Sequence, residues 1–124
     1  MKTTIIILSL MLTGCVLIPT PFDPVMYDRV VTLSTSTSEA TSQCGSPAMQ
    51  AESEVLKDQS KALMKYTEFA SKDMHSSLAI VDKNITELSN AYEKGTPSTA
   101  YCKLKLTIIN NDLDLILQGA GAKQ

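Results

Sequence analysis

A long stretch without glycine or proline, residues 48–94, constrains the fold of this 124-residue chain more than any other feature. Apolar side chains recur within it at steps of three and four residues, the period of one face of an α-helix. They are Leu56, Leu63, Tyr66, Ala70, Met74, Leu78, Val81, Ile85, Leu88 and Tyr92. Gly95 follows the stretch at the position that glycine favours after a helix. The pattern predicts either one long helix or two shorter ones.

Three dipeptides have the composition of helix starts: Asp23-Pro24, Ser46-Pro47 and Thr96-Pro97. In each, an N-cap side chain that can accept a hydrogen bond from a backbone N–H precedes a proline suited to the first helical position. The last of these helices is expected to run from Pro97 to about Gln118 and to end at Gly119.

The first helix should begin at Pro24 and present Met26, Val30 and Leu33 on one face. Its end is harder to place, because residues 34–38 are all serine or threonine, which have poor helix propensity. We expect this segment to fray or to form a loop before Cys44.

The N-terminus has a composition of its own. Lys2 gives a positive start, and residues 5–12 form an apolar run that is too short to span a bilayer, which takes about 20 residues. This arrangement is typical of a secretory signal peptide. The following Leu12-Thr13-Gly14-Cys15 resembles the lipobox of bacterial lipoproteins, in which small residues precede a cysteine that is lipidated before cleavage. An ordinary signal peptide containing a cysteine, or an N-terminal core helix, is the alternative.

The lipobox resemblance implies that residues 1–14 are removed and that Cys15 carries a diacylglycerol and an N-acyl chain. Several acyl chains anchor a protein stably without a transmembrane helix. Val16 stands where an aspartate would resemble the inner-membrane retention signal of enteric bacteria. For a Gram-negative host, the resemblance therefore implies the outer membrane, with the protein facing the periplasm.

The mature chain of about 110 residues has the size of one small domain. Residues 15–23 form a lipidated tether, which Pro19 and Pro21 should keep extended. Residues 24–118 form the helical domain, and residues 119–124 a C-terminal tail. The net charge of −2, with no tryptophan and only two phenylalanines, argues against nucleic-acid binding, which calls for a basic stripe and stacking platforms.

With Cys15 assigned to lipid, Cys44 and Cys102 remain as a pair. In a secreted domain an even remainder predicts a disulfide, and closing a loop of about 58 residues would stabilise the fold by roughly 4 kcal/mol. Two buried free thiols are the alternative.

The disulfide also bears on the long stretch, because one helix over residues 48–94 would be about 70 Å long and would hold the two cysteines apart. A reversal within residues 71–77, capped by Ser71 or Asp73, brings them together. We therefore predict an all-α fold, a small antiparallel bundle of three to four helices with one disulfide. A long-helix dimer with an apolar seam is the alternative.

Motifs of catalysis are scarce. His75 is the single histidine, and its acidic and hydroxyl neighbours in sequence cannot face it on a helix, so we expect a solvated or turn histidine. Gly45-Ser46 lacks the frame of a nucleophile elbow. The carboxylates Asp112 and Asp114 lie on different helix faces. We expect no enzyme, no metal site, no cofactor beyond the lipid on Cys15 and no small-molecule substrate.

Lys57, Lys61 and Lys65 stand four residues apart and should form a basic ridge on one helix face. Such a ridge is either a solvated surface or a contact for anionic lipid headgroups or an acidic partner.

The residues around Phe22-Asp23-Pro24, Tyr66-Thr67-Glu68 and the run 97–105 make the mature chain similar to a group of small lipoproteins of phage and bacterial genomes. The resemblance implies a non-enzymatic, membrane-anchored binding module that contacts an outer-membrane protein and excludes a second phage, a role called superinfection exclusion. A pilotin-like envelope assembly helper, which it resembles in size and class, or a structural envelope lipoprotein acting as a dimeric spacer, are the alternatives.

Overall fold

The computed structural model describes residues 22–121, and within them the chain is almost entirely helical. The elements are α2 (Pro24–Ala40), the short 3₁₀ helix η1 (Thr41–Gln43), α3 (Ala48–Ala70), α4 (Lys72–Lys94) and α5 (Thr99–Gly121). The described residues contain no strand, so the predicted all-α fold is confirmed.

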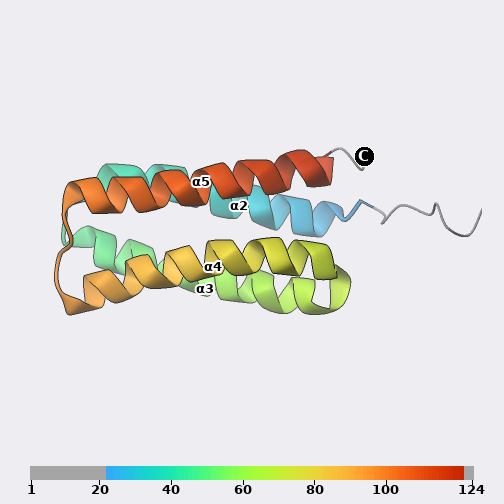
Figure 1. Ribbon diagram of the computed structural model, residues 1–124, viewed down its shortest axis with the longest axis horizontal. Coiled ribbons are helices and arrows are strands. Elements are labelled where there is room, and N and C mark those ends of the chain that lie inside the picture. Colours follow the sequence, from blue (N-terminus) through green and yellow to red (C-terminus); the bar gives the residue numbers. More distant parts are fainter. Residues whose placement is uncertain (1–21, 122–124) are drawn as a thin grey trace, which may run out of the picture.

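The four long helices form an up-and-down antiparallel bundle (Figure 1). Helix α2 packs against α3 and α5, and α4 packs against the same two helices. We call the end of the bundle that holds Phe22, the α3–α4 junction and the end of α5 the entry end. The opposite end, which holds η1 and the α4–α5 connection, is the disulfide end.

The core follows an alternation of four- and three-residue steps in every helix. Its average of 3.5 residues is the repeat with which helices keep one seam facing their neighbours in bundles and coiled coils. The positions on this repeat are Met26, Val30, Leu33, Thr37 and Ala40 in α2; Met49, Ser53, Leu56, Ser60, Leu63 and Thr67 in α3; Met74, Leu78, Val81, Ile85, Leu88 and Tyr92 in α4; and Cys102, Leu106, Ile109, Leu113, Ile116 and Ala120 in α5. Ser89 of α4, beside Leu88, is buried as well.

A single residue, Ser71, separates α3 from α4. Its backbone is extended, with φ −160° and ψ 114°, and its hydroxyl accepts a hydrogen bond from the Met74 N–H at 3.3 Å. It therefore ends one helix and caps the next. The predicted reversal within residues 71–77, with Ser71 as the cap, is confirmed, and the single long helix is wrong.

Of the three predicted helix starts, only the first is correct to the residue. Asp23 caps α2, and its Oδ1 accepts hydrogen bonds from two backbone N–H groups at 3.0 and 3.1 Å. Helix α3 begins one residue after Pro47. Helix α5 begins at Thr99 instead of Pro97, because Ser98 accepts a hydrogen bond from the Tyr101 N–H at 3.1 Å and so acts as the cap.

Both helix ends that the sequence placed early extend further. Helix α2 continues through the serine and threonine run to Ala40, because Thr37 is buried and its hydroxyl donates to the Leu33 carbonyl within the helix. Helix α5 passes Gly119 and ends at Gly121, because Ala120 occupies the next core position and is only 3% exposed. The expected end at Gln118 is therefore wrong.

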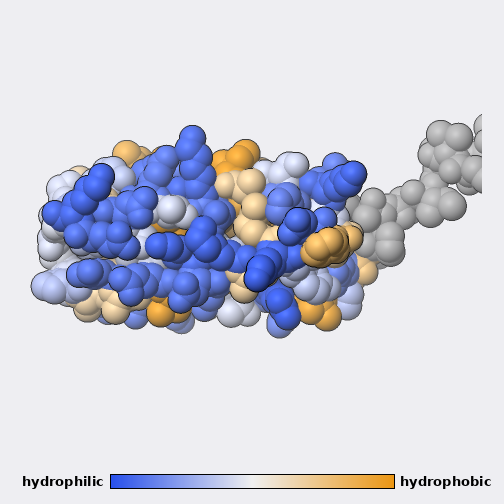
Figure 2. Space-filling model, turned by 90° about the horizontal axis from the view of Figure 1, so that it is seen from below, coloured by the Kyte–Doolittle hydropathy of each residue, from blue (hydrophilic) through white to orange (hydrophobic). Residues whose placement is uncertain are grey.

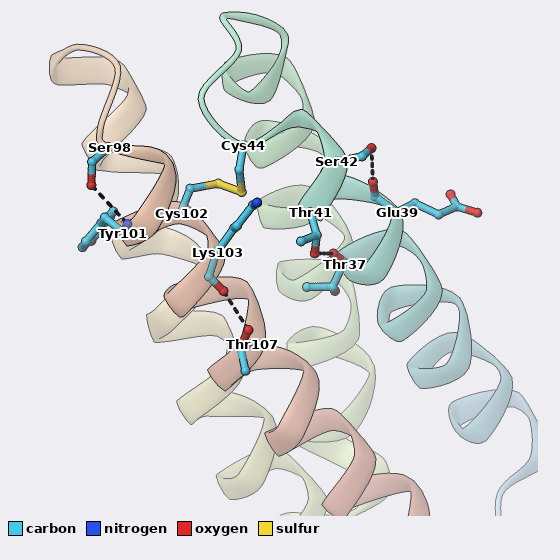
Figure 3. Close-up of a disulfide and its surroundings, with 10 residues drawn as sticks. All are labelled: Thr37, Glu39, Thr41, Ser42, Cys44, Ser98, Tyr101, Cys102, Lys103 and Thr107. Atoms are coloured by element: carbon cyan, nitrogen blue, oxygen red, sulfur yellow. Dashed lines mark hydrogen bonds between the residues drawn. A yellow bond between two sulfur atoms is a disulfide. The ribbon is translucent and has the colours of Figure 1, made fainter.

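The predicted disulfide joins Cys44, in the connection after η1, to Cys102 in the first turns of α5 (Figure 3). The two Cα atoms are 5.6 Å apart, and Cys102 is fully buried. The next residue, Gly45, has φ +83°, and a Cβ placed there would lie 2.2 Å from the Thr99 hydroxyl oxygen. Glycine is therefore required where the connection passes α5.

Candidate functional site

The expected lipidation site, Cys15, lies outside the described residues, as does most of the tether. The description begins at Phe22, whose ring lies 5.5 Å from the Tyr27 ring at the entry end. Since Cys15 precedes Phe22 in the sequence, the chain that leads from Cys15 joins the bundle at the entry end.

At the entry end, a polar cluster fixes the start of α2 to α3. The Tyr66 hydroxyl donates a 2.8 Å hydrogen bond to Oδ2 of Asp23, and the Arg29 guanidinium lies 4.9 Å from the centre of the Tyr66 ring. The backbone N–H of Met26, together with the Tyr66 hydroxyl, holds the pKa of Asp23 below its ordinary value. The same hydrogen bond raises the pKa of Tyr66, because ionisation would remove the donated proton.

Phe69 lies one turn beyond Tyr66 and is 90% exposed. It is the most exposed large hydrophobic residue in the described part of the chain, ahead of Leu115 at 66%. It ends α3 next to Ala70, immediately before the turn at Ser71. Phe69 was not predicted as a surface residue, although its place between the core positions Thr67 and Met74 carries the signal.

The predicted basic ridge turns out to be mainly a helix–helix contact. Lys57 lies 4.0 Å from the Glu93 carboxylate, and Lys61 lies 3.6 Å from that of Asp82, both on α4. Lys65 makes no ion pair with any described residue. Since exposed pairs of this kind contribute about 0–1 kcal/mol each, two of the three lysines serve the α3–α4 seam modestly.

A depression of about 590 Å³ lies between α3 and α4 and is open to solvent. Its lining includes the apolar residues Ala62 and Met64 together with five charged and polar side chains. They are Lys61, Lys65, Glu68, His75 and Asp82. The view over α3 and α4 is mostly hydrophilic, with hydrophobic residues in separate groups (Figure 2).

His75 is half-buried in this depression, in the first turn of α4, so of the two expectations, a solvated or a turn histidine, the solvated one is wrong. Its Nδ1 lies 3.1 Å from the Met64 carbonyl and 3.3 Å from the Thr67 hydroxyl, both on α3. A carbonyl oxygen only accepts, so Nδ1 carries the proton. The one-residue turn at Ser71 brings the two helices back close enough for this contact, which links α4 to α3.

A second surface feature lies on α5. Leu104, Ile108 and Leu115, here called the α5 apolar stripe, are 61%, 39% and 66% exposed. Their spacing of four and seven residues places them on one side of the helix. Ile80 of α4, which is 57% exposed, lines a small depression together with Leu115.

The described residues hold no group of three histidine, cysteine or acidic side chains that could bind a metal ion. None of the helices between residues 22 and 121 is long and apolar enough to cross a bilayer.

At the α4–α5 contact, Lys105 pairs with Glu87 and also donates to the Asn84 side chain at 3.2 Å. The hydrogen bond that Lys105 donates to the Glu87 carboxylate lowers the pKa of Glu87.

The described residues form a disulfide-linked antiparallel four-helix bundle, with an open depression between α3 and α4 and an apolar stripe on α5. No protein-family model matches the chain, and no curated protein or solved structure is significantly similar to it.

Proposed function

We propose that the protein is a lipoprotein, anchored through Cys15 to the outer membrane and facing the periplasm, and that it binds another envelope protein without catalysing a reaction. The observation that carries the proposal is the Leu12-Thr13-Gly14-Cys15 sequence, placed seven residues before a bundle closed by a disulfide. Disulfides persist in oxidising compartments such as the periplasm, so the bond and the secretory signal agree.

The geometry of the anchor keeps the bundle close to the lipid. Seven residues span at most about 25 Å even when fully extended. A helix of 23 residues, such as α3, is about 35 Å long. A bundle of these dimensions presents its sides within reach of the periplasmic parts of membrane proteins.

The α3–α4 depression is the surface that best suits a folded partner. Its rim offers hydrogen-bond donors and acceptors of both charges, with Lys65 free of any ion pair to the described residues. Polar rims of this kind provide orientation and specificity more than affinity. In superinfection exclusion the partner is an outer-membrane protein that serves as a phage receptor.

The test combines anchoring with phage growth in a Gram-negative host. We expect the wild-type protein to incorporate an alkyne-labelled fatty acid, to fractionate with the outer membrane and to lower the plating efficiency of phages that share one receptor. Cys15→Ala should abolish the labelling and the exclusion together. Lys65→Glu should keep the labelling and lose exclusion, while the exposed Lys94→Glu serves as its matched control. Unchanged plating of all receptor classes by a correctly anchored protein contradicts the exclusion role.

The α5 apolar stripe favours a second function, that of a pilotin-like assembly helper. A helical partner could lay its own apolar face against Leu104, Ile108 and Leu115, as amphipathic helices do on apolar surfaces. In a host with a secretion or pilus system, Ile108→Lys with Leu115→Lys should then block delivery of the subunit to the outer membrane. Loss of delivery in the Lys65→Glu variant instead would argue for the polar depression.

A further inference from the structure

We propose that the entry end rests on the membrane and that Phe69 inserts into the interface between lipid headgroups and acyl chains. The proposal rests on the lipid anchor proposed above and names a second, non-covalent contact with the same membrane. It assigns an orientation to the bundle, with the entry end at the lipid and the disulfide end away from it.

The exposure of Phe69 supports this contact with the membrane. At 90% it is open to solvent on nearly all sides, whereas the other exposed large hydrophobic residues of the described chain range from 39% to 66%. It is not needed for the core, because Thr67 and Met74 occupy the neighbouring buried positions. A phenylalanine ring gains by leaving water, and the lipid interface is an apolar environment within reach.

The position of the Phe69 ring relative to the proposed anchor also supports the contact. Tyr66, one turn before Phe69, holds Asp23 by a 2.8 Å hydrogen bond, so the chain from the membrane reaches the bundle beside the exposed ring. The seven residue-to-residue steps from Cys15 to Phe22 limit the distance between these two residues to about 25 Å. Such a short linker gives the second contact a high effective concentration at the membrane surface.

The charges around Phe69 bear on the kind of lipid that it contacts. The exposed residues flanking Phe69 are two lysines, Lys65 and Lys72, and two acids, Glu68 and Asp73. Beside Lys65 and Glu68, the depression is also lined by three further titratable groups, Lys61, Asp82 and the half-buried His75. Because the lysines and acids balance, the contact depends on apolar insertion, and zwitterionic phospholipid is a sufficient partner.

The absence of tryptophan from the chain allows a direct test. The lipidated Phe69→Trp variant is reconstituted into phosphatidylcholine vesicles whose acyl chains carry bromine near the headgroups. Its indole emission should shift to the blue and be quenched at least twofold. The matched control is Val55→Trp, at a residue that is 50% exposed on the same helix, about 21 Å along its axis. Its emission should remain unquenched.

Three outcomes are distinguishable. Missing acyl chains by mass spectrometry, with no flotation of the protein with vesicles, contradict the anchor itself. An anchored protein whose two tryptophan variants are quenched equally, or not at all, overturns the Phe69 contact and leaves the anchor intact. Quenching that requires anionic lipid and disappears at high salt also overturns it, because lysines would then make the contact. Equal melting temperatures of the variants verify that both are folded.

Discussion

The Tyr66 hydroxyl and the Asp23 carboxylate, 2.8 Å apart, join the N-cap residue of α2 to the last two turns of α3. Asp23 uses its other oxygen to cap α2, so one side chain serves a local and a long-range contact. This arrangement makes the entry end sensitive to acid.

Acidification should weaken the fold through Asp23. Because its folded-state pKa lies below the ordinary value of 3.8, its contribution is complete above that value and is lost as pH falls through the lower folded-state pKa. Asp23→Asn retains a capping oxygen without titrating. Urea denaturation at about pH 5 and about pH 2 should show a larger loss for the wild type than for Asp23→Asn. Equal losses would contradict the assignment.

Removing the disulfide should lower the free energy of unfolding by up to about 4 kcal/mol, because the bond closes a loop with a sequence separation of 58 residues. The measurement is urea denaturation of the Cys44→Ala, Cys102→Ala double variant, compared with oxidised wild type. Wild type under reducing conditions is the control, and it should agree with the double variant in midpoint. Both should retain their helical circular dichroism. A change below about 1 kcal/mol would show that the bond contributes little.

Gly45→Ala should destabilise the protein by more than about 1 kcal/mol, because an L residue at φ +83° is strained and its Cβ would overlap the Thr99 side chain. Gly119→Ala is the matched control, since Gly119 is exposed in α5 with open space around its Cα. There alanine should stabilise the helix by about 0.5–1 kcal/mol. Chemical denaturation of both variants checks the opposite signs.

The cap at Ser71 should contribute to stability, whereas the reversal of the chain should survive its loss. Ser71→Ala removes the hydrogen bond to the Met74 N–H and should cost about 1 kcal/mol, whereas Ser71→Asp keeps a cap and should cost little. Light scattering after size-exclusion chromatography checks the fold, because joining α3 and α4 into one helix would require a larger assembly. We expect both variants to have the molecular mass of the wild type.

Much of this fold was predictable because its core is regular. The steps from Met74 to Tyr92 and the pairing of Cys44 with Cys102 follow from spacing and from the need to bring two cysteines together, whereas the choice between Ser71 and Asp73 as the cap was left open. The extent of α2 was not predictable, because the poor helix propensity of serine and threonine argues against a helix at residues 34–38. Burial of Thr37 and the hydrogen bond of its hydroxyl to the helix override it.

The surfaces were less accessible to sequence reasoning. The lysine ridge is visible in the spacing, but its partners Glu93 and Asp82 belong to another helix. The contact of His75 with Met64 likewise crosses the α3–α4 turn. The exposure of Phe69 depends on where α3 ends, and the position of a helix end is set by the capping of the next helix at Ser71.

The position of the disulfide also determines how the molecule would carry a mechanical load. The bond encloses α3 and α4 in a covalent ring, while α2 lies outside it, between the N-terminal side of the chain and Cys44. Tension applied between the N-terminal side of the chain and the C-terminal part of α5 would pass from Cys44 to Cys102 through the bond. Such tension could peel away α2 and the end of α5, but it would bypass α3 and α4, which lie inside the ring and would not be extended.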